Sequence, residues 1–126
     1  MNGQALPITG DGTETRDWTY VDDIISGLLA MGIKEEAIGE AFNLGSAKEH
    51  RVIDMANMVN KLAGNEAGIV FAERRNWDVK CRLLSSVEKA SKVLGYKPKM
   101  QFEDGLKNIH QWFYENWANI KSFAEF

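Results

Sequence analysis

The chain has 126 residues, of which 44% are hydrophobic, so it can bury a modest core as one domain or as part of a larger protein. Its formal net charge is -3, and its basic residues are scattered, which argues against binding to a nucleic-acid backbone. The single cysteine, Cys81, excludes an internal disulfide, and no His/Cys cluster suits a metal. No apolar stretch approaches the roughly 18 residues of a membrane span, and no secretory signal is visible. We expect a metal-free cytoplasmic protein.

The predicted elements of the first half alternate between strands and helices. A short strand over residues 6–8 leads into a glycine-rich turn. Apolar residues then recur at three- and four-residue spacing over residues 21–31, which predicts a helix that ends at Gly32. Residues 41–44 form a short apolar stretch typical of a buried strand.

The second half continues the alternation with one strand and three helices. The pattern predicts a helix over 52–62, a strand over 69–71, a helix over 87–94, and a helix from residue 102 to 117. Gly64 and Gly95 are placed to end the helices that precede them. The order strand, helix, strand, helix, strand, helix, helix indicates an α/β fold with few strands and about four helices. A sheet this small would be incomplete if it stood alone.

Two arginine-containing loops are candidates for anion binding. The guanidinium of Arg16 matches phosphate oxygens in pairs, although an ion pair with Asp17 or another carboxylate is its more ordinary role. Arg74 and Arg75, with Asp78, form a second candidate cluster in a loop that follows a predicted strand. The two loops can share one ligand only if the fold brings strand ends together, as α/β sheets commonly do.

Other polar motifs give no catalytic set. The turn GDGTET, residues 10–15, imitates a dinucleotide fingerprint but lacks its third glycine, and its acidic residues would repel a pyrophosphate. His50 precedes a predicted helix, where a cap is usual, and His110 lies on a helix flank, so both are expected to be structural. Cys81 is expected to be packed or half-exposed. No tyrosine is followed four positions later by a lysine. The aromatic residues of segment 112–117 are expected to pack in a core or an interface.

Four separated motifs together resemble the nucleotide-sugar epimerase and dehydratase family, the extended short-chain dehydrogenases. In chain order they are GDGTETRDWTYVDD, AFNLGS, RRNWDVK and KASKVLGYKPKMQFEDGLKNIHQWF. The resemblance implies a two-part enzyme, in which an N-terminal Rossmann unit holds NAD and a smaller C-terminal part binds a UDP- or dTDP-sugar. Residues 1–126 are similar to the C-terminal, substrate-binding part. The glycine fingerprint and the Tyr-x-x-x-Lys pair, which the family carries in its N-terminal half, are absent from this sequence.

The resemblance also assigns roles to single residues. Arg16 aligns with an arginine that contacts the nucleotide diphosphate, and Arg75 with a second phosphate-binding arginine. Asp78 aligns with an acidic residue expected to hold ribose hydroxyls or to orient an arginine. Two positions depart from the family pattern: Ser86 stands where many relatives have Asp and is expected to cap the next helix, and His50 stands where Ser or Thr is usual, at a cost of up to about 1 kcal/mol.

The resemblance therefore implies a nucleotide-sugar-binding portion that is inactive by itself, from a parent that is an NAD-dependent epimerase (an isomerase) or a 4,6-dehydratase (a lyase). NAD is expected in the parent and not on this portion. A free-standing, non-catalytic binding module that reuses this half-fold is the alternative. Because residues 41–44 would be a strand that lacks its neighbour, we also expect a homodimer or swapped oligomer that covers this edge and the apolar side of helix 21–31.

Overall fold

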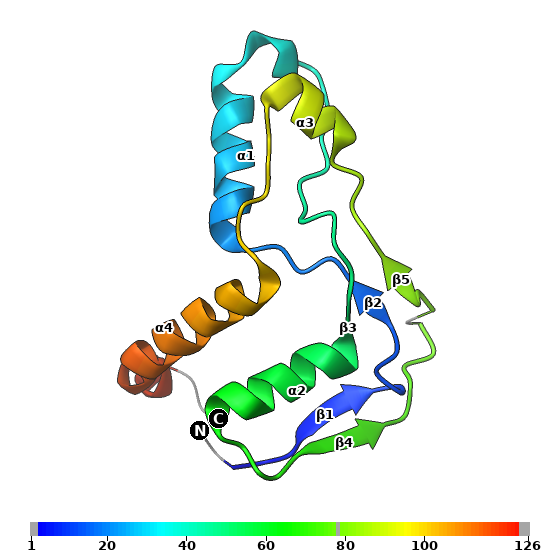
Figure 1. Ribbon diagram of the computed structural model, residues 1–126, viewed down its shortest axis with the longest axis vertical. Coiled ribbons are helices and arrows are strands. Elements are labelled where there is room, and N and C mark those ends of the chain that lie inside the picture. The colour runs from blue at the N-terminus through cyan, green and yellow to red at the C-terminus, as the bar shows by residue number, and fades with distance from the viewer. Residues whose placement is uncertain (1–2, 78, 124–126) are drawn as a thin grey trace.

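The computed structural model describes residues 3–77 and 79–123, and the fold is α/β with four α-helices and five short strands among these residues (Figure 1). The strands form two small sheets. In one, β1 pairs in parallel with β4, and in the other, β2 lies between antiparallel β3 and parallel β5. The elements are β1 Leu6–Thr9, β2 Thr15–Arg16, α1 Val21–Ile33, the short 3-10 helix η1 Glu35–Ala37, β3 His50–Arg51, α2 Val52–Ala63, β4 Ile69–Ala72, β5 Arg82–Leu83, α3 Glu88–Leu94 and α4 Phe102–Phe123.

Two helices end at the glycines that the sequence indicates. Gly64 follows α2 with a φ of 59°, and Gly95 follows α3 with a φ of 70°, a left-handed conformation that glycine adopts without steric cost. Helix α1 differs, because it continues through Gly32 to Ile33 and ends where the amide of Lys34 donates to the carbonyl of Ala30 (3.2 Å). A glycine within a helix lowers its stability but does not force it to end.

The predicted cap of α2 is wrong. His50 lies in β3, the N-cap residue is Arg51, and its side chain makes no capping hydrogen bond. The amides of the first two residues of α2 instead donate to the backbone carbonyls of Glu14 and Gly12, at 2.9 Å each. Backbone carbonyls of the glycine-rich turn therefore accept the hydrogen bonds of the first α2 amides, in place of a capping Ser or Thr side chain. The ring of His50 stacks on that of Phe102, with centroids 4.2 Å apart.

The predicted cap of α3 is wrong as well. Val87 occupies the N-cap position and makes no side-chain capping bond, while Ser86 lies one residue outside. This helix has 7 residues and buries Ala90 and Leu94. A helix this short depends on packing of its apolar face more than on its cap.

Residues 41–44 do not form a strand. A strand needs a neighbour to satisfy its backbone groups, and none lies beside this segment in the described part of the chain. Phe42 and Leu44 instead pack against a core cluster of Ala90, Leu94 and Tyr96. The short apolar stretch thus packs on the core as a loop, and its backbone pairs with no strand in the described part of the chain.

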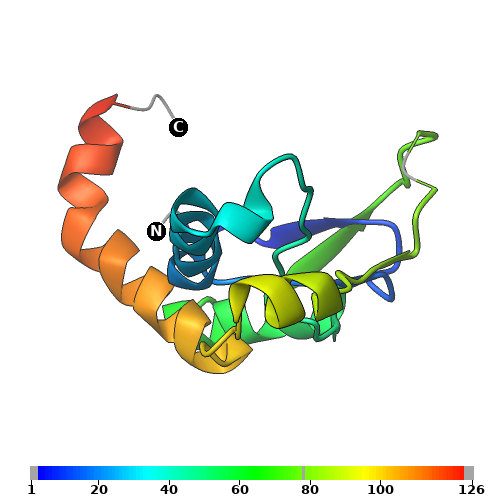
Figure 2. The same cartoon turned by 90° about the horizontal axis from the view of Figure 1, so that it is seen from above.

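The molecule is elongated, with α1 and α3 at one end and α2, β1 and β4 at the other (Figure 1). Helix α4 begins against α2, and its second half extends away from the rest of the chain (Figure 2). Much of α1 is uncovered: Leu28, Leu29 and Ile33 are 52%, 65% and 83% exposed. Of the aromatic residues of α4 expected to pack in a core or an interface, Trp112 and Tyr114 are 55% and 74% exposed, and Trp117 is half-buried.

Candidate functional site

Two loops run side by side from one parallel strand pair to the other. The first joins β1 to β2, and the second joins β4 to β5; β1 pairs with β4 and β2 pairs with β5. At the start of the loops the amide of Gly10 donates to the carbonyl of Ala72, and at their end that of Thr15 donates to the carbonyl of Cys81, both at 2.9 Å. The two loops are therefore held together at both of their ends.

Arg16 lies in β2, the central strand of its sheet, opposite His50 on one side and Leu83 on the other. It is half-buried, and its Nη1 donates to the carbonyl oxygen of Thr15 (2.9 Å). The hydroxyl of Thr15 donates to Glu49 Oε1 (2.7 Å), which ties the strand to the segment before α2. The backbone that carries Arg16 is thus held on both edges.

Arg75 lies in the β4–β5 loop and is exposed. Its guanidinium carbon lies 5.3 Å from the ring centroid of Trp77, within the range of a cation–π contact. A shallow depression of about 350 Å³ is lined there by Arg74, Arg75, Asn76 and Val79. Asp78, the third candidate residue, lies outside the described residues. Cys81 in the same loop is exposed rather than packed, and Arg74 Nη2 lies 3.7 Å from its sulfur.

The carboxylate of Asp17, directly after Arg16, joins three segments. It accepts hydrogen bonds from the amide and hydroxyl of Ser46 (2.8 and 2.5 Å), from the amide of Ala47 (3.1 Å) and from the amide of Ser85 (3.2 Å). Burial would raise the pKa of Asp17, but these hydrogen bonds stabilise the ionised form and lower its pKa overall. Sequence reasoning treated Asp17 only as an ion-pair partner, because its acceptor role depends on contacts across 29 to 68 residues.

Glu49 and Arg82 form a second polar contact beside Arg16. Arg82 donates to both carboxylate oxygens of Glu49, with its Nη2 2.6 Å from Oε2. Hydrogen bonds from Arg82 and then from Thr15 lower the pKa of Glu49 to about 2. Glu49, which directly precedes β3, thus binds Thr15 of β2 and Arg82 of β5, and so links the three strands of this sheet.

We expect the chain to lose stability in acid because of these two carboxylates. The folded-state pKa values of Glu49 and Asp17 are both lowered, so the unfolded chain binds more protons. The stabilisation is complete above the ordinary carboxyl pKa of about 4 and is lost as the pH falls toward 2. Urea unfolding at a series of pH values would measure it. Glu49→Gln should flatten the dependence below pH 4, and an unchanged slope in that variant would contradict the assignment.

The glycine-rich turn does not fit NAD. A pyrophosphate needs open amides at the start of a helix, but this turn leads into β2. The amides of Gly10, Thr13 and Thr15 already donate within the protein, that of Thr13 to Asp11 Oδ1 at 2.9 Å. The carboxylate of Glu14 also lies beneath Gly10. Gly10 and Gly12 have φ values of 85° and 76°, which confirms the interpretation as a turn.

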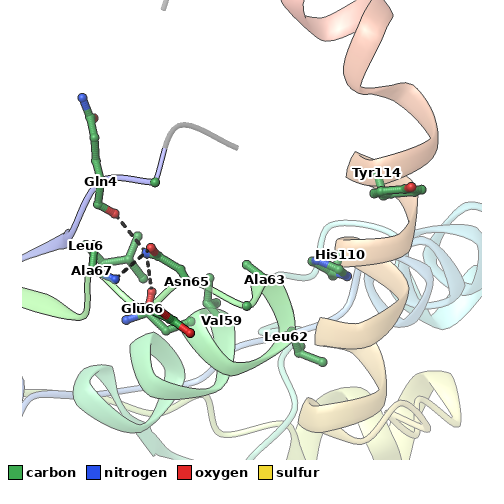
Figure 3. A pocket seen from close by; sticks show the side chains of 13 residues that line it. Gln4, Leu6, Val59, Leu62, Ala63, Asn65, Glu66, Ala67, His110 and Tyr114 are labelled. Carbon is green, nitrogen blue, oxygen red and sulfur yellow. Dashed lines mark hydrogen bonds between the residues drawn. The ribbon is translucent and has the colours of Figure 1, made fainter.

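A larger open cavity of about 660 Å³ lies between the start of β1, the end of α2 and α4 (Figure 3). His110 and Tyr114 of α4 line one side of it, and Asn65 on the other side donates to the carbonyl of Gln4 (2.9 Å). The cavity lies at the opposite end of β1 from the arginine loops, so it is not part of the candidate site.

Among residues 3–77 and 79–123, no cluster of His, Cys, Asp and Glu could hold a metal, and no helix has the length and apolarity to span a bilayer.

Comparison with known proteins identifies the family. The family model described as GDP-mannose 4,6 dehydratase matches residues 1–109. The chain belongs to the NAD-dependent epimerase and dehydratase family. Among curated proteins, dTDP-glucose 4,6-dehydratase 1 of Escherichia coli is 32% identical over 136 residues, which cover 98% of this chain and 37% of that protein. The chain spans only 18% to 37% of the length of the first curated relatives.

Solved structures of family members match the fold. An epimerase from Methanothermobacter thermautotrophicus is 58% identical with a TM-score of 0.96, and the match covers 99% of this chain and 37% of that one. The UDP-glucose 4-epimerase of Thermotoga maritima, solved with UDP-glucose, is 29% identical with a TM-score of 0.83 over 91% of this chain and 36% of that one. The resemblance inferred from the four motifs is confirmed, and the chain aligns to part of these epimerases.

Proposed function

We propose that residues 1–126 form the C-terminal, nucleotide-sugar-binding portion of an NAD-dependent epimerase or dehydratase, with Arg16 and Arg75 as the diphosphate-binding residues. The ligand is a UDP- or dTDP-sugar, and Asp78 holds the ribose or orients an arginine. NAD and the groups that transfer hydride and proton belong to a part of the enzyme outside these residues. The observation that carries the proposal is the pair of adjacent loops between the two parallel strand pairs: the first leads into Arg16, and the second carries Arg75.

The chemistry of the two loops supports this assignment. Guanidinium groups stay protonated and donate in pairs to phosphate oxygens, and two of them can neutralise a diphosphate. Relatives of the same family act on or bind such ligands: one is a UDP-glucuronic acid 4-epimerase from Bacillus cereus, solved with UDP-glucuronic acid and NAD, which is 32% identical to this chain with a TM-score of 0.81 over 90% of it.

The exposed apolar face of α1 supports the proposal that another portion of the enzyme packs against this helix. Ile25, Leu28 and Leu29 lie on one side of this helix at 45%, 52% and 65% exposure, which is unusual for a helix in a finished core. The NAD-binding portion, or a second copy of this chain, would cover that face. Residues 41–44 pair with no strand in the described part of the chain, so a partner that supplies a neighbouring strand would satisfy their backbone groups.

Calorimetry with UDP, dTDP and uridine tests the function. Arg16→Ala and Arg75→Ala should each weaken binding of the two diphosphates by about tenfold, which corresponds to about 1.4 kcal/mol, and leave uridine binding unchanged. Lys107→Ala is a matched control, because it removes a surface cation of α4 that pairs with Asp104. UDP affinity that falls no further in the arginine variants than in the control would contradict the proposal.

An activity assay separates this proposal from the free-standing module. The chain alone should convert no UDP-glucose in the presence of NAD, because it lacks the Tyr-x-x-x-Lys pair. Co-expression with the NAD-binding portion of the Methanothermobacter relative should restore conversion if the chain is an enzyme portion. A free-standing module would bind UDP-sugar without gaining activity.

A further inference from the structure

Glu14 places a buried carboxylate between the two arginine-containing loops. The residue is 4% exposed, and its Oε1 lies 3.2 Å from Nη2 of Arg74, whose side chain is 39% exposed. Its other oxygen, Oε2, is buried and has no hydrogen-bond partner among the described residues. A carboxylate with one buried oxygen that lacks a hydrogen bond costs folding free energy, which makes its contact with Arg74 the feature to explain.

The backbone fixes the position of Glu14 tightly. Its carbonyl accepts the first amide of α2 at 2.9 Å, and the next residue, Thr15, begins β2. Its side chain lies beneath Gly10, where an added Cβ would come within 2.8 Å of Oε1. Gly10 therefore leaves the space that the carboxylate occupies, and Glu14 can reach across to the neighbouring loop.

Arg74, at the base of the β4–β5 loop, links Glu14 to the other end of that loop. Its Nη2 contacts both Glu14 and the sulfur of Cys81, seven residues later, so the two ends of the loop are joined at one guanidinium. Arg75 follows immediately, with its guanidinium over Trp77. Arg75 is thus attached directly next to the residue whose guanidinium joins the two loops.

We propose that Glu14 is a positioning residue that acts through Arg74 to hold the Arg75–Trp77 part of the loop in the geometry that receives a diphosphate. The ligand part of this inference rests on the proposed function. The loop-positioning part rests only on the contacts of Glu14, Arg74 and Cys81.

Fluorine NMR of protein labelled with 5-fluorotryptophan tests the loop directly. The chain has four tryptophans, and Trp77→Phe assigns the loop signal. Glu14→Gln and Arg74→Gln should each shift or broaden the Trp77 signal while the other three stay in place, and the double variant should match the single ones. Glu40→Gln is the matched control, because it breaks an exposed ion pair with Lys89 of α3.

Binding of UDP and uridine provides the second measurement. Glu14→Gln should weaken UDP binding by about fivefold, with uridine binding unchanged. An unmoved Trp77 signal would overturn the inference, as would equal movement of all four signals, since that indicates a general structural role. If the wild-type chain binds no UDP, the proposed function fails, while the Trp77 signal still decides whether Glu14 positions the loop.

Discussion

Replacing Asp17 by alanine is expected to lower the free energy of unfolding by about 3 kcal/mol. The carboxylate accepts one hydrogen bond from the nearby Thr19 and four from Ser46, Ala47 and Ser85, which belong to two segments distant from it in sequence. Hydrogen bonds to a charged acceptor contribute more than neutral ones, and their loss leaves backbone amides without a partner. Because the side chain is only half-buried, water replaces part of the loss.

Chemical denaturation at pH 7 measures this effect. Asp17→Asn should fall between wild type and Asp17→Ala, because the amide keeps one acceptor oxygen but loses the charge. Asp22→Ala is the control: this exposed carboxylate lies in the first turn of α1, where its loss costs less than about 1 kcal/mol. A loss for Asp17→Ala no greater than for the control would refute the role of Asp17.

The helices could be predicted from the sequence because their signals are local. Apolar residues at three- and four-residue spacing define α2 and α4, and Gly64 and Gly95 adopt the left-handed conformation that ends a helix. The strand over 69–71 also follows from local composition, and the structure extends it by one residue to Ala72.

The three-stranded sheet of β2, β3 and β5 could not be predicted, because each of its strands has two residues and carries no periodicity. The caps failed for a related reason. The donors at the start of α2 are satisfied by carbonyls of the glycine-rich turn, some 40 residues earlier in the chain, and nothing local to His50 indicates this. Residues 41–44 have strand composition, but a strand also requires a neighbour that composition does not specify.

The binding role of the candidate residues stays a prediction, and only their places in the fold can be compared with the sequence. The sequence placed Arg16 and Arg75 in separate loops after strands; Arg75 does lie in a loop, whereas Arg16 lies in β2 at the end of its loop. The residues that hold the loops were missed. Glu14 appeared only as a charge that would repel phosphate, and its contact with Arg74 spans 60 positions, which a single sequence cannot reveal.

Gly45→Ala is expected to lower the free energy of unfolding by about 2 to 3 kcal/mol. Gly45 is buried, and an added Cβ would overlap the side chain of Ser85 and lie 2.6 Å from Oδ2 of Asp17. Its carbonyl also accepts the hydroxyl hydrogen of Tyr96 at 3.0 Å, so the backbone cannot move away without breaking that bond. Gly32→Ala is the control, because Gly32 is helical with open space around it, and alanine there should stabilise α1 by about 0.5 to 1 kcal/mol.

The effects of Gly45→Ala and Asp17→Ala on the free energy of unfolding should not be additive, because both substitutions disturb the contact between Asp17 and Ser85. A methyl group at residue 45 displaces the Asp17 carboxylate from the amide of Ser85, so part of the loss from Asp17→Ala has already occurred in Gly45→Ala. The double variant should therefore lose at least about 1 kcal/mol less than the sum of the single variants. Strict additivity in urea unfolding would mean that the methyl group is accommodated by movement of Ser85 alone, and that the Asp17 contacts survive it.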